Sequence, residues 1–317
     1  MSLARTFVLK TSSLPLVERM VRRSFLFRPL VRRFIAGDTL EEAIKASEAL
    51  LAKGLRISLD YLGENTRSEQ EALDAKATYI QMLERIAQVP VVRDYNANPV
   101  GPEPLNISIK LTQCGLDQGE AFAEKNYRDV LEVAKGFHNF VRIDMESSDY
   151  TDRTMAMIGR VRPDYPNTGT VLQSYLYRTP KDVEQVIEWQ ARTRIVKGAY
   201  LEPPSVAYPE KEKVDEAYVQ QAKELLLRGY YPAIATQDEK IIRELNAFVA
   251  ENKIDKSRFE YQMLYGIRRD LQDSLVAEGY NVRIYVPFGD SWYPYFTRRL
   301  AERPANAFFI LKAMFKG

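Results

Sequence analysis

Short apolar runs alternate with longer amphipathic segments from Leu55 to the end of the chain. The amphipathic segments have the spacing of helices and are expected at 68–89, 118–137, 151–161, 180–192, 213–228, 238–251, 267–278 and 291–301. The apolar runs have the length of strands and start near Arg56, Asn106, Val141, Thr170, Arg194, Ala233, Phe259 and Val282. The chain therefore reads as eight strand–helix units in succession.

Eight such units without a long structureless interruption predict a closed parallel (β/α)8 barrel, a TIM-like fold of about 250 residues. A doubly wound open sheet is the alternative, but no Gly-x-Gly-x-x-Gly pattern follows the first strand. We expect the barrel at 55–306, an N-terminal helical extension at 1–54 and a helical tail at 307–317. The extension contains a predicted helix at 38–53, which a capping box of Thr39 and Glu42 would begin and Gly54 would end.

Side-chain parity along each strand separates the lumen from the outer face. The aliphatic residues take one parity, which leaves polar residues facing inward. The inward set is Arg56, Ser58, Asp60, Ser108, Lys110, Thr112, Arg142, Asp144, Glu146, Arg194, Val196, Gly198, Tyr200, Glu260, Gln262, Leu264, Arg283 and Tyr285.

These inward charges divide by their position along the strands. Buried charges are costly unless paired, so we expect Arg56, Arg142 and Arg283, early in their strands, to join carboxylates in a structural lower layer. Chemistry in barrels lies at the carboxyl ends of the strands. The residues placed there are Lys110, Asp144, Arg194, Tyr200 and Tyr285.

Arg298 and Arg299 form an adjacent pair in the last predicted helix, which Asp290 or Ser291 would cap. Two neighbouring guanidiniums suit a small carboxylate, and Glu302 shares their helix face and can hold them. A solvated basic surface is the simpler alternative. Four aromatic residues nearby favour a dry pocket instead: Trp292, Tyr293, Tyr295 and Phe296.

Composition narrows the chemistry. Of 317 residues, 45 are basic and 43 acidic, so the net charge of +2 argues against nucleic-acid binding. One cysteine, Cys114, excludes an intrachain disulfide, and we interpret it as incidental. One histidine, His138, argues against a multi-histidine metal centre or a Ser-His triad, and we expect no metal.

Three motifs resemble those of proline dehydrogenases: Arg194-Ile-Val-Lys-Gly-Ala-Tyr200, Tyr285-Val-Pro-Phe-Gly289 and Trp292-Tyr-Pro-Tyr-Phe-Thr-Arg-Arg-Leu-Ala-Glu-Arg-Pro-Ala-Asn306. Stretches at 62–65, 107–111, 142–146 and 173–175 support them in matching order, and the length resembles that of a monofunctional member. The resemblance implies an FAD-dependent enzyme that oxidises L-proline to 1-pyrroline-5-carboxylate and passes electrons to a quinone.

The resemblance also implies roles for individual residues. Asp144 and Arg194 would be catalytic, and the proline carboxylate would be held by Lys110, Arg298 and Arg299, with Glu302 orienting the arginine pair. The proline ring would lie against Tyr200, Leu264 and Tyr285. FAD would be lined by Met145, Gln173, Arg194, Val196, Lys197, Gly198, Thr236 and Gln237. The sequence departs from the family at Gln237, where histidine is usual, and at Phe288, where tyrosine is common.

Two other functions remain open from the residues alone. A cofactor-free aldolase or lyase would use Lys197 or Lys110 as an amine, although Lys197 has the parity opposite to Arg194. The second open function is that of a non-catalytic barrel that only binds a small acid.

The basic, amphipathic residues 1–35 would either lie on anionic lipid or pack on the barrel, with a break at Pro29. No apolar run reaches the roughly 18 residues of a membrane span, and no signal peptide is evident. Because quinones dissolve in the bilayer, we expect a cytoplasmic protein in peripheral contact with the cytoplasmic face of the membrane. The contact would use residues 1–35 or the apolar segment 307–315.

Overall fold

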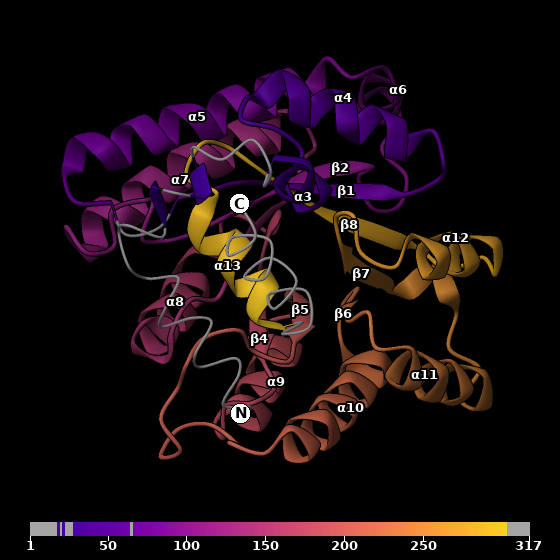
Figure 1. The fold of residues 1–317 in the computed structure, drawn as a ribbon. Coiled ribbons are helices and arrows are strands. Elements are labelled where there is room, and N and C mark those ends of the chain that lie inside the picture. The colour runs from indigo at the N-terminus through magenta and orange to yellow at the C-terminus, as the bar shows by residue number, and fades with distance from the viewer. Residues whose placement is uncertain (1–17, 20, 23–27, 64–65, 303–317) are drawn as a thin grey trace, which may run out of the picture.

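A computed structural model of the chain describes residues 18–19, 21–22, 28–63 and 66–302, excluding the side chains of residues 300–302. Its eight parallel strands pair in sequence order, and β1 pairs with β8, so the sheet closes and confirms the predicted (β/α)8 barrel (Figure 1). The strands are β1 (Arg56–Tyr61), β2 (Leu105–Ile109), β3 (Val141–Ile143), β4 (Thr168–Gln173), β5 (Arg192–Val196), β6 (Ala233–Ala235), β7 (Glu260–Leu264) and β8 (Val282–Phe288).

Helices follow the strands on the outside of the barrel, as Figure 1 shows. Each helix predicted between residues 38 and 301 has a counterpart, whereas the helical tail predicted at 307–317 lies outside the described residues. The described helices are α3 (Arg28–Phe34), α4 (Leu40–Leu51), α5 (Glu69–Ala87), α6 (Pro90–Ala97), α7 (Glu120–Gly136), α8 (Ser148–Val161), α9 (Thr179–Glu188), α10 (Lys211–Arg228), α11 (Glu239–Glu251), α12 (Arg269–Ala277) and α13 (Tyr293–Glu302). A 3₁₀ turn at Lys256–Arg258 precedes β7. No helix in the described part of the chain is long and apolar enough to cross a membrane.

Local signals explain several helix ends. The capping box at α4 is present, since the Thr39 hydroxyl accepts from the Glu42 backbone and Glu42 accepts from the Thr39 backbone. Gly54 follows α4 with φ +79°, a conformation that glycine adopts without strain. Helix α6 was missed because only Val92 in it is buried, which leaves no apolar period to detect.

The predicted end of one helix and the predicted N-cap of another were wrong. Helix α9 ends at Glu188, before the predicted 192, because Gln190 turns the chain with φ +50° and β5 already begins at Arg192. Helix α9 begins at Thr179, whose hydroxyl donates to the Gln173 carbonyl oxygen. Helix α13 begins at Tyr293, so neither Asp290 nor Ser291 is adjacent to its first turn as a cap.

The apolar core lies between the strands and the surrounding helices. Ile57 and Leu59 of β1 and Ile107 and Ile109 of β2 are fully buried, as parity predicted. They belong to one buried cluster with apolar side chains of α5, namely Tyr79, Met82, Leu83 and Ile86. Burial of this face leaves the opposite parity of the same strands for the lumen.

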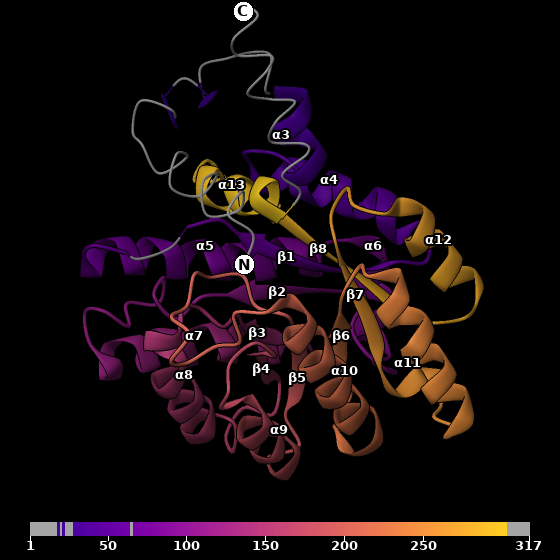
Figure 2. The same cartoon turned by 60° about the horizontal axis from the view of Figure 1, so that its bottom comes forward.

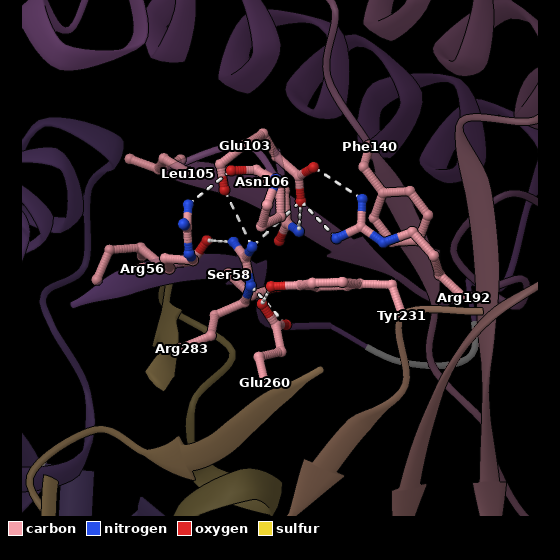
Figure 3. A network of polar contacts seen from close by, with 12 residues as sticks. Arg56, Ser58, Glu103, Leu105, Asn106, Phe140, Arg192, Tyr231, Glu260 and Arg283 are labelled. Atoms are coloured by element: carbon pink, nitrogen blue, oxygen red, sulfur yellow. Dashed lines mark hydrogen bonds and ion pairs between the residues drawn. The ribbon is translucent and has the colours of Figure 1, made fainter. Parts of the chain in front are cut away.

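Charged side chains fill the end of the lumen where the strands begin (Figure 3). Arg192 pairs with Glu103 (Nη1 to Oε2, 2.8 Å), and Arg283 pairs with Glu260 (Nε to Oε1, 2.8 Å) and with Glu103 (Nη2 to Oε1, 3.3 Å). Burial alone would raise the pKa of Glu103, but Arg192 and Arg283 outweigh it and lower the pKa to about 2. The predicted layer of paired charges is therefore confirmed for Arg283.

The other two arginines predicted for this layer do not form ion pairs with carboxylates of the described residues. Arg142 is fully buried and donates to the carbonyl oxygens of Thr170 and Arg192. Arg56 is half-buried and donates to the carbonyl oxygen of Pro102. Both arginines thus donate to backbone carbonyl oxygens in place of the expected carboxylates.

We expect Arg283→Met to lower the free energy of unfolding by about 3–5 kcal/mol, because Glu260 would stay buried without its cation. Urea denaturation followed by circular dichroism measures the change. Arg228→Met is the matched control, since Arg228 is half-exposed and pairs with Glu184 at the surface, where little change is expected. Equal stability of the two variants would contradict a structural role for the layer.

Candidate active site

A cavity of about 660 Å³ lies at the carboxyl ends of the strands. The parallel strands of a barrel all end on this rim, so residues far apart in sequence converge there. Every side chain predicted for the site, except that of Glu302, lines this one cavity: Lys110, Asp144, Met145, Gln173, Arg194, Val196, Lys197, Gly198, Tyr200, Thr236, Gln237, Leu264, Tyr285, Arg298 and Arg299. The side chain of Glu302 lies outside the described residues.

Asp144 is the centre of a polar network in the cavity. It directly follows β3, and its Oδ1 accepts from Arg194 Nη1 at 2.7 Å. Its Oδ2 accepts from the Tyr285 hydroxyl at 2.6 Å and lies 3.7 Å from Lys110 Nζ. Burial and the Asp144 charge raise the pKa of Tyr285 well above its usual value, so the phenol keeps its proton and donates.

Arg194 is held from several strands at once. Its Nε donates to Gln262 on β7, its Nη2 donates to Ser108 on β2 at 3.1 Å, and its guanidinium lies 5.0 Å from the centre of the Tyr285 ring. With the contact to Asp144, these bonds fix the direction of the planar group. A charge fixed before reaction needs no reorganisation when the reaction occurs.

Asp60 is a member of the site to which sequence analysis gave no role. Its Oδ1 is 2.8 Å from Lys110 Nζ, and both side chains are buried. Burial raises the pKa of Asp60, against the opposing effect of the Lys110 charge. Parity had placed Asp60 inward. On the neighbouring strand Asp60 pairs with Ser108, two residues before Lys110, and this register could have identified the contact between Asp60 and Lys110.

Helix α13 lies across this end of the barrel and carries the guanidinium pair. Arg298 lies 5.7 Å from the centre of the Tyr200 ring, and Arg299 lies 5.3 Å from that of Tyr295. Of the four aromatic residues expected to wall a dry pocket, only Tyr295 lines the cavity, where Tyr200 and Tyr285 join it. The expectation was wrong for Trp292, Tyr293 and Phe296, which pack in or against the apolar cluster between α13 and α3. Two guanidiniums, with Lys110 on the rim below, thus face a cavity with aromatic walls.

The opposite part of the cavity is formed by the loop after β5 and by the ends of β4 and β6. Lys197 begins this loop, and its Nζ lies 2.6 Å from Asp215 and 3.0 Å from Asp238. Gly198 has φ +118°, and a Cβ there would come within 2.4 Å of the Tyr175 ring. The backbone can follow this path only with glycine at that position.

Gln173 presents a buried acceptor in the same region. Its Nε2 donates to the carbonyl oxygens of Met145 and Glu146, which fixes the orientation of the amide. Its Oε1 is buried and has no hydrogen-bond partner among the residues that the structure describes. A buried acceptor without a partner is costly, so a ligand with an N–H donor suits this position.

The single cysteine and histidine are not part of the cavity lining. Cys114 is fully buried, and burial raises its pKa to about 12, so the thiol keeps its proton. His138 is exposed in the turn between α7 and β3, at the end of the barrel where β3 starts.

The closed barrel and the buried charged cluster define the chain as a (β/α)8 barrel with a polar site at its carboxyl rim, where barrel enzymes have their active sites. The chain belongs to the proline dehydrogenase family, because the family model described as "Proline dehydrogenase" matches residues 43–312.

Curated relatives agree with this assignment. Proline dehydrogenase 1 of Bacillus subtilis subsp. natto is 41% identical over 90% of both chains, and proline dehydrogenase of Deinococcus radiodurans is 40% identical over 99% of both chains. The fold matches a crystal structure of proline utilization A (PutA) from Bdellovibrio bacteriovorus inactivated by N-propargylglycine. That match has a TM-score of 0.80 at 23% identity and covers 95% of this chain and 37% of that one.

We expect Lys110→Met to destabilise the protein more at pH 8 than at pH 5. Without the lysine, the folded-state pKa of Asp60 rises further above its unfolded value of about 3.9, so stability falls as pH increases through that range. Unfolding free energies at the two pH values measure the difference. The double variant Lys110→Met, Asp60→Asn is the control and should lose the added pH dependence; if it keeps that dependence, Asp60 is not its source.

Proposed function

We propose that the protein is an FAD-dependent enzyme that oxidises L-proline to 1-pyrroline-5-carboxylate and passes the electrons to a quinone. The observation that carries the proposal is the buried network of Asp144, Arg194, Tyr285 and Lys110 in one cavity with Arg298. Membership of the proline dehydrogenase family supports proline as the substrate.

The residues in the cavity fit FAD. Gln173 Oε1 is an acceptor suited to the imide N–H of an isoalloxazine ring. Gly198 keeps the wall flat beside Tyr175, and the residues that would hold FAD are Met145, Gln173, Arg194, Val196, Lys197, Gly198, Thr236 and Gln237. When bound, FAD supplies the redox chemistry by accepting a hydride from the substrate carbon beside the ring nitrogen.

The cations of the rim would hold the proline carboxylate. Arg298 and Arg299 offer planar forks of donors, and Lys110 offers a compact ammonium from β2. We propose Glu302 as the residue that orients the arginine pair. The ring would then lie against Tyr200, Leu264 and Tyr285, and a clamp at one end of so small a substrate fixes its reacting carbon in place.

The network around Asp144 would serve the reaction itself. Hydride leaves most readily when the neighbouring ring nitrogen is a neutral amine, and the Asp144 carboxylate lies among the polar groups that would order that amine. The fixed charge of Arg194 would stabilise the negative charge that two-electron transfer develops in the cavity.

The contacts of the two lysines favour this function over Schiff-base catalysis. A Schiff-base lysine must present a free amine to the carbonyl of its substrate, but both lysines are engaged in short ion pairs. Lys110 lies 2.8 Å from Asp60, and Lys197 lies 2.6 Å from Asp215. Both are thus placed to act as cations.

We expect the purified protein to show a flavin absorption spectrum that bleaches when L-proline is added without oxygen. Arg298→Ala should weaken proline binding by about 2–4 kcal/mol in this titration, because a charge-assisted contact to the carboxylate is lost. Arg243→Ala changes an exposed arginine on α11 and serves as the control. A colourless protein without FAD would refute the proposed function, and unchanged proline affinity in Arg298→Ala would remove the clamp.

The proposal extends to peripheral membrane contact, because a quinone acceptor dissolves in the bilayer. The segment 307–315 and most of 1–35 lie outside the described residues. We expect vesicles containing anionic lipid to cosediment with the whole chain and less with a chain that lacks 307–317 or 1–17. Equal cosedimentation of the whole chain and both truncations would exclude these segments.

A further inference from the structure

Helix α3 forms part of the cavity wall, although it lies in the segment that sequence analysis assigned to an extension of the barrel. Arg33 and Phe34, at the end of this helix, line the same cavity as Leu264 and Arg298. Figure 2 shows α3 and α13 on the same side of the barrel. The substrate end of the cavity is therefore built from both the start and the end of the described chain.

The segment after α3 is joined to the rim of the barrel by backbone contacts. The Ala36 amide donates to the Pro287 carbonyl oxygen at 2.9 Å, and the Gly289 amide donates to the Gly37 carbonyl oxygen at 3.0 Å. Both bonds reach the end of β8, the strand that leads into α13. These contacts fix the C-terminal end of α3 relative to the strand ends.

Gly266 makes a second, closer contact with α3. It lies in the turn between β7 and α12 with φ +73°, and a Cβ there would come within 1.7 Å of the Arg33 carbonyl oxygen. The Arg33 Nε also makes a long contact of 3.5 Å with the Gly266 carbonyl oxygen. No residue with a side chain fits at this position unless the end of α3 moves.

The same turn of α3 packs on α13. Phe34 and Phe296 have ring centres 6.4 Å apart, and both belong to a buried cluster with Val31, Ile35 and Tyr295. Helix α13 carries the guanidinium pair two and three residues after Phe296. A shift at the end of α3 would therefore be passed to the guanidinium pair through this aromatic contact.

We propose that Phe34, seated by the close contact between Gly266 and Arg33, is a positioning residue that holds α13 so that Arg298 and Arg299 face the substrate. The proposal rests on the proposed function, because it concerns how the substrate carboxylate is held. It assigns part of the substrate site to α3, which precedes the first strand of the barrel.

Gly266→Ala tests the proposal, with Gly101→Ala as the matched control. Gly101 has φ +71°, nearly the same as Gly266, but a Cβ there meets no atom within 4 Å. The two variants therefore share the backbone strain and differ in the contact with Arg33. We expect Gly266→Ala to raise KM for L-proline about tenfold over the control, with kcat at saturating proline close to that of the control. Its melting temperature should be lower than that of the control, because the added Cβ meets backbone.

Binding of tetrahydrofuran-2-carboxylate, measured by calorimetry on the flavin-loaded protein, gives a readout that needs no turnover. The Kd of this acid should rise about as much as KM, both in Gly266→Ala and in Phe34→Leu. The second variant removes the ring contact with Phe296 and keeps an apolar side chain. Phe34→Leu decides the matter if Gly266→Ala does not fold.

Acid binding in Phe34→Leu as tight as in the control would overturn the proposal, and so would a fall in kcat with KM unchanged. Failure of the proposed function is distinguishable, because it would appear in the unsubstituted protein as absent FAD or absent bleaching by L-proline.

Discussion

Charged side chains inside the closed barrel must find partners there, and this requirement determines how both ends of the lumen are built. The lumen excludes bulk water, so each charge pointing into it must be balanced by a group from another strand. At one end, Arg283 joins β8 to Glu260 on β7. At the other, Asp144 after β3 joins Arg194 on β5 and Tyr285 on β8. The same requirement therefore produces a structural layer where the strands begin and a polar cluster where they end.

The two layers differ in what surrounds them. Arg283 and Glu260 are fully enclosed, and their donors and acceptors are met by protein. Asp144, Arg194 and Lys110 instead border the cavity, where a ligand can share their charges. The polar cluster at the cavity rests on this enclosed and rigid layer, so its dipoles are fixed. Fixed dipoles stabilise a developing charge better than groups that must reorient. The charges at this end are thus paired with one another and also border a space that a ligand can enter.

Periodicity and parity predicted the barrel and most of its lumen, because both are local properties of a strand. They placed Lys110, Asp144 and Arg194 on the cavity side, where the structure has them. Glu103 and Arg192 were missed because they lie just before a strand and at its first residue, where parity is not yet defined. Asp60 was placed inward, but parity does not state which cation an inward acid meets. Arg33 and Phe34 contact residues more than 200 positions away, and no local pattern encodes such contacts.

The Asp144 cluster and helix α13 are held in place in different ways. The Asp144 cluster is attached to strands whose hydrogen bonds form one closed sheet, so its geometry is fixed with the barrel. Helix α13 instead meets α3 through side-chain contacts, such as that of Phe34 with Phe296. Side-chain contacts can be remade without breaking the sheet, and regions held in this way belong to the less stable part of a protein. The guanidinium pair on α13 can therefore shift without disturbing the Asp144 cluster.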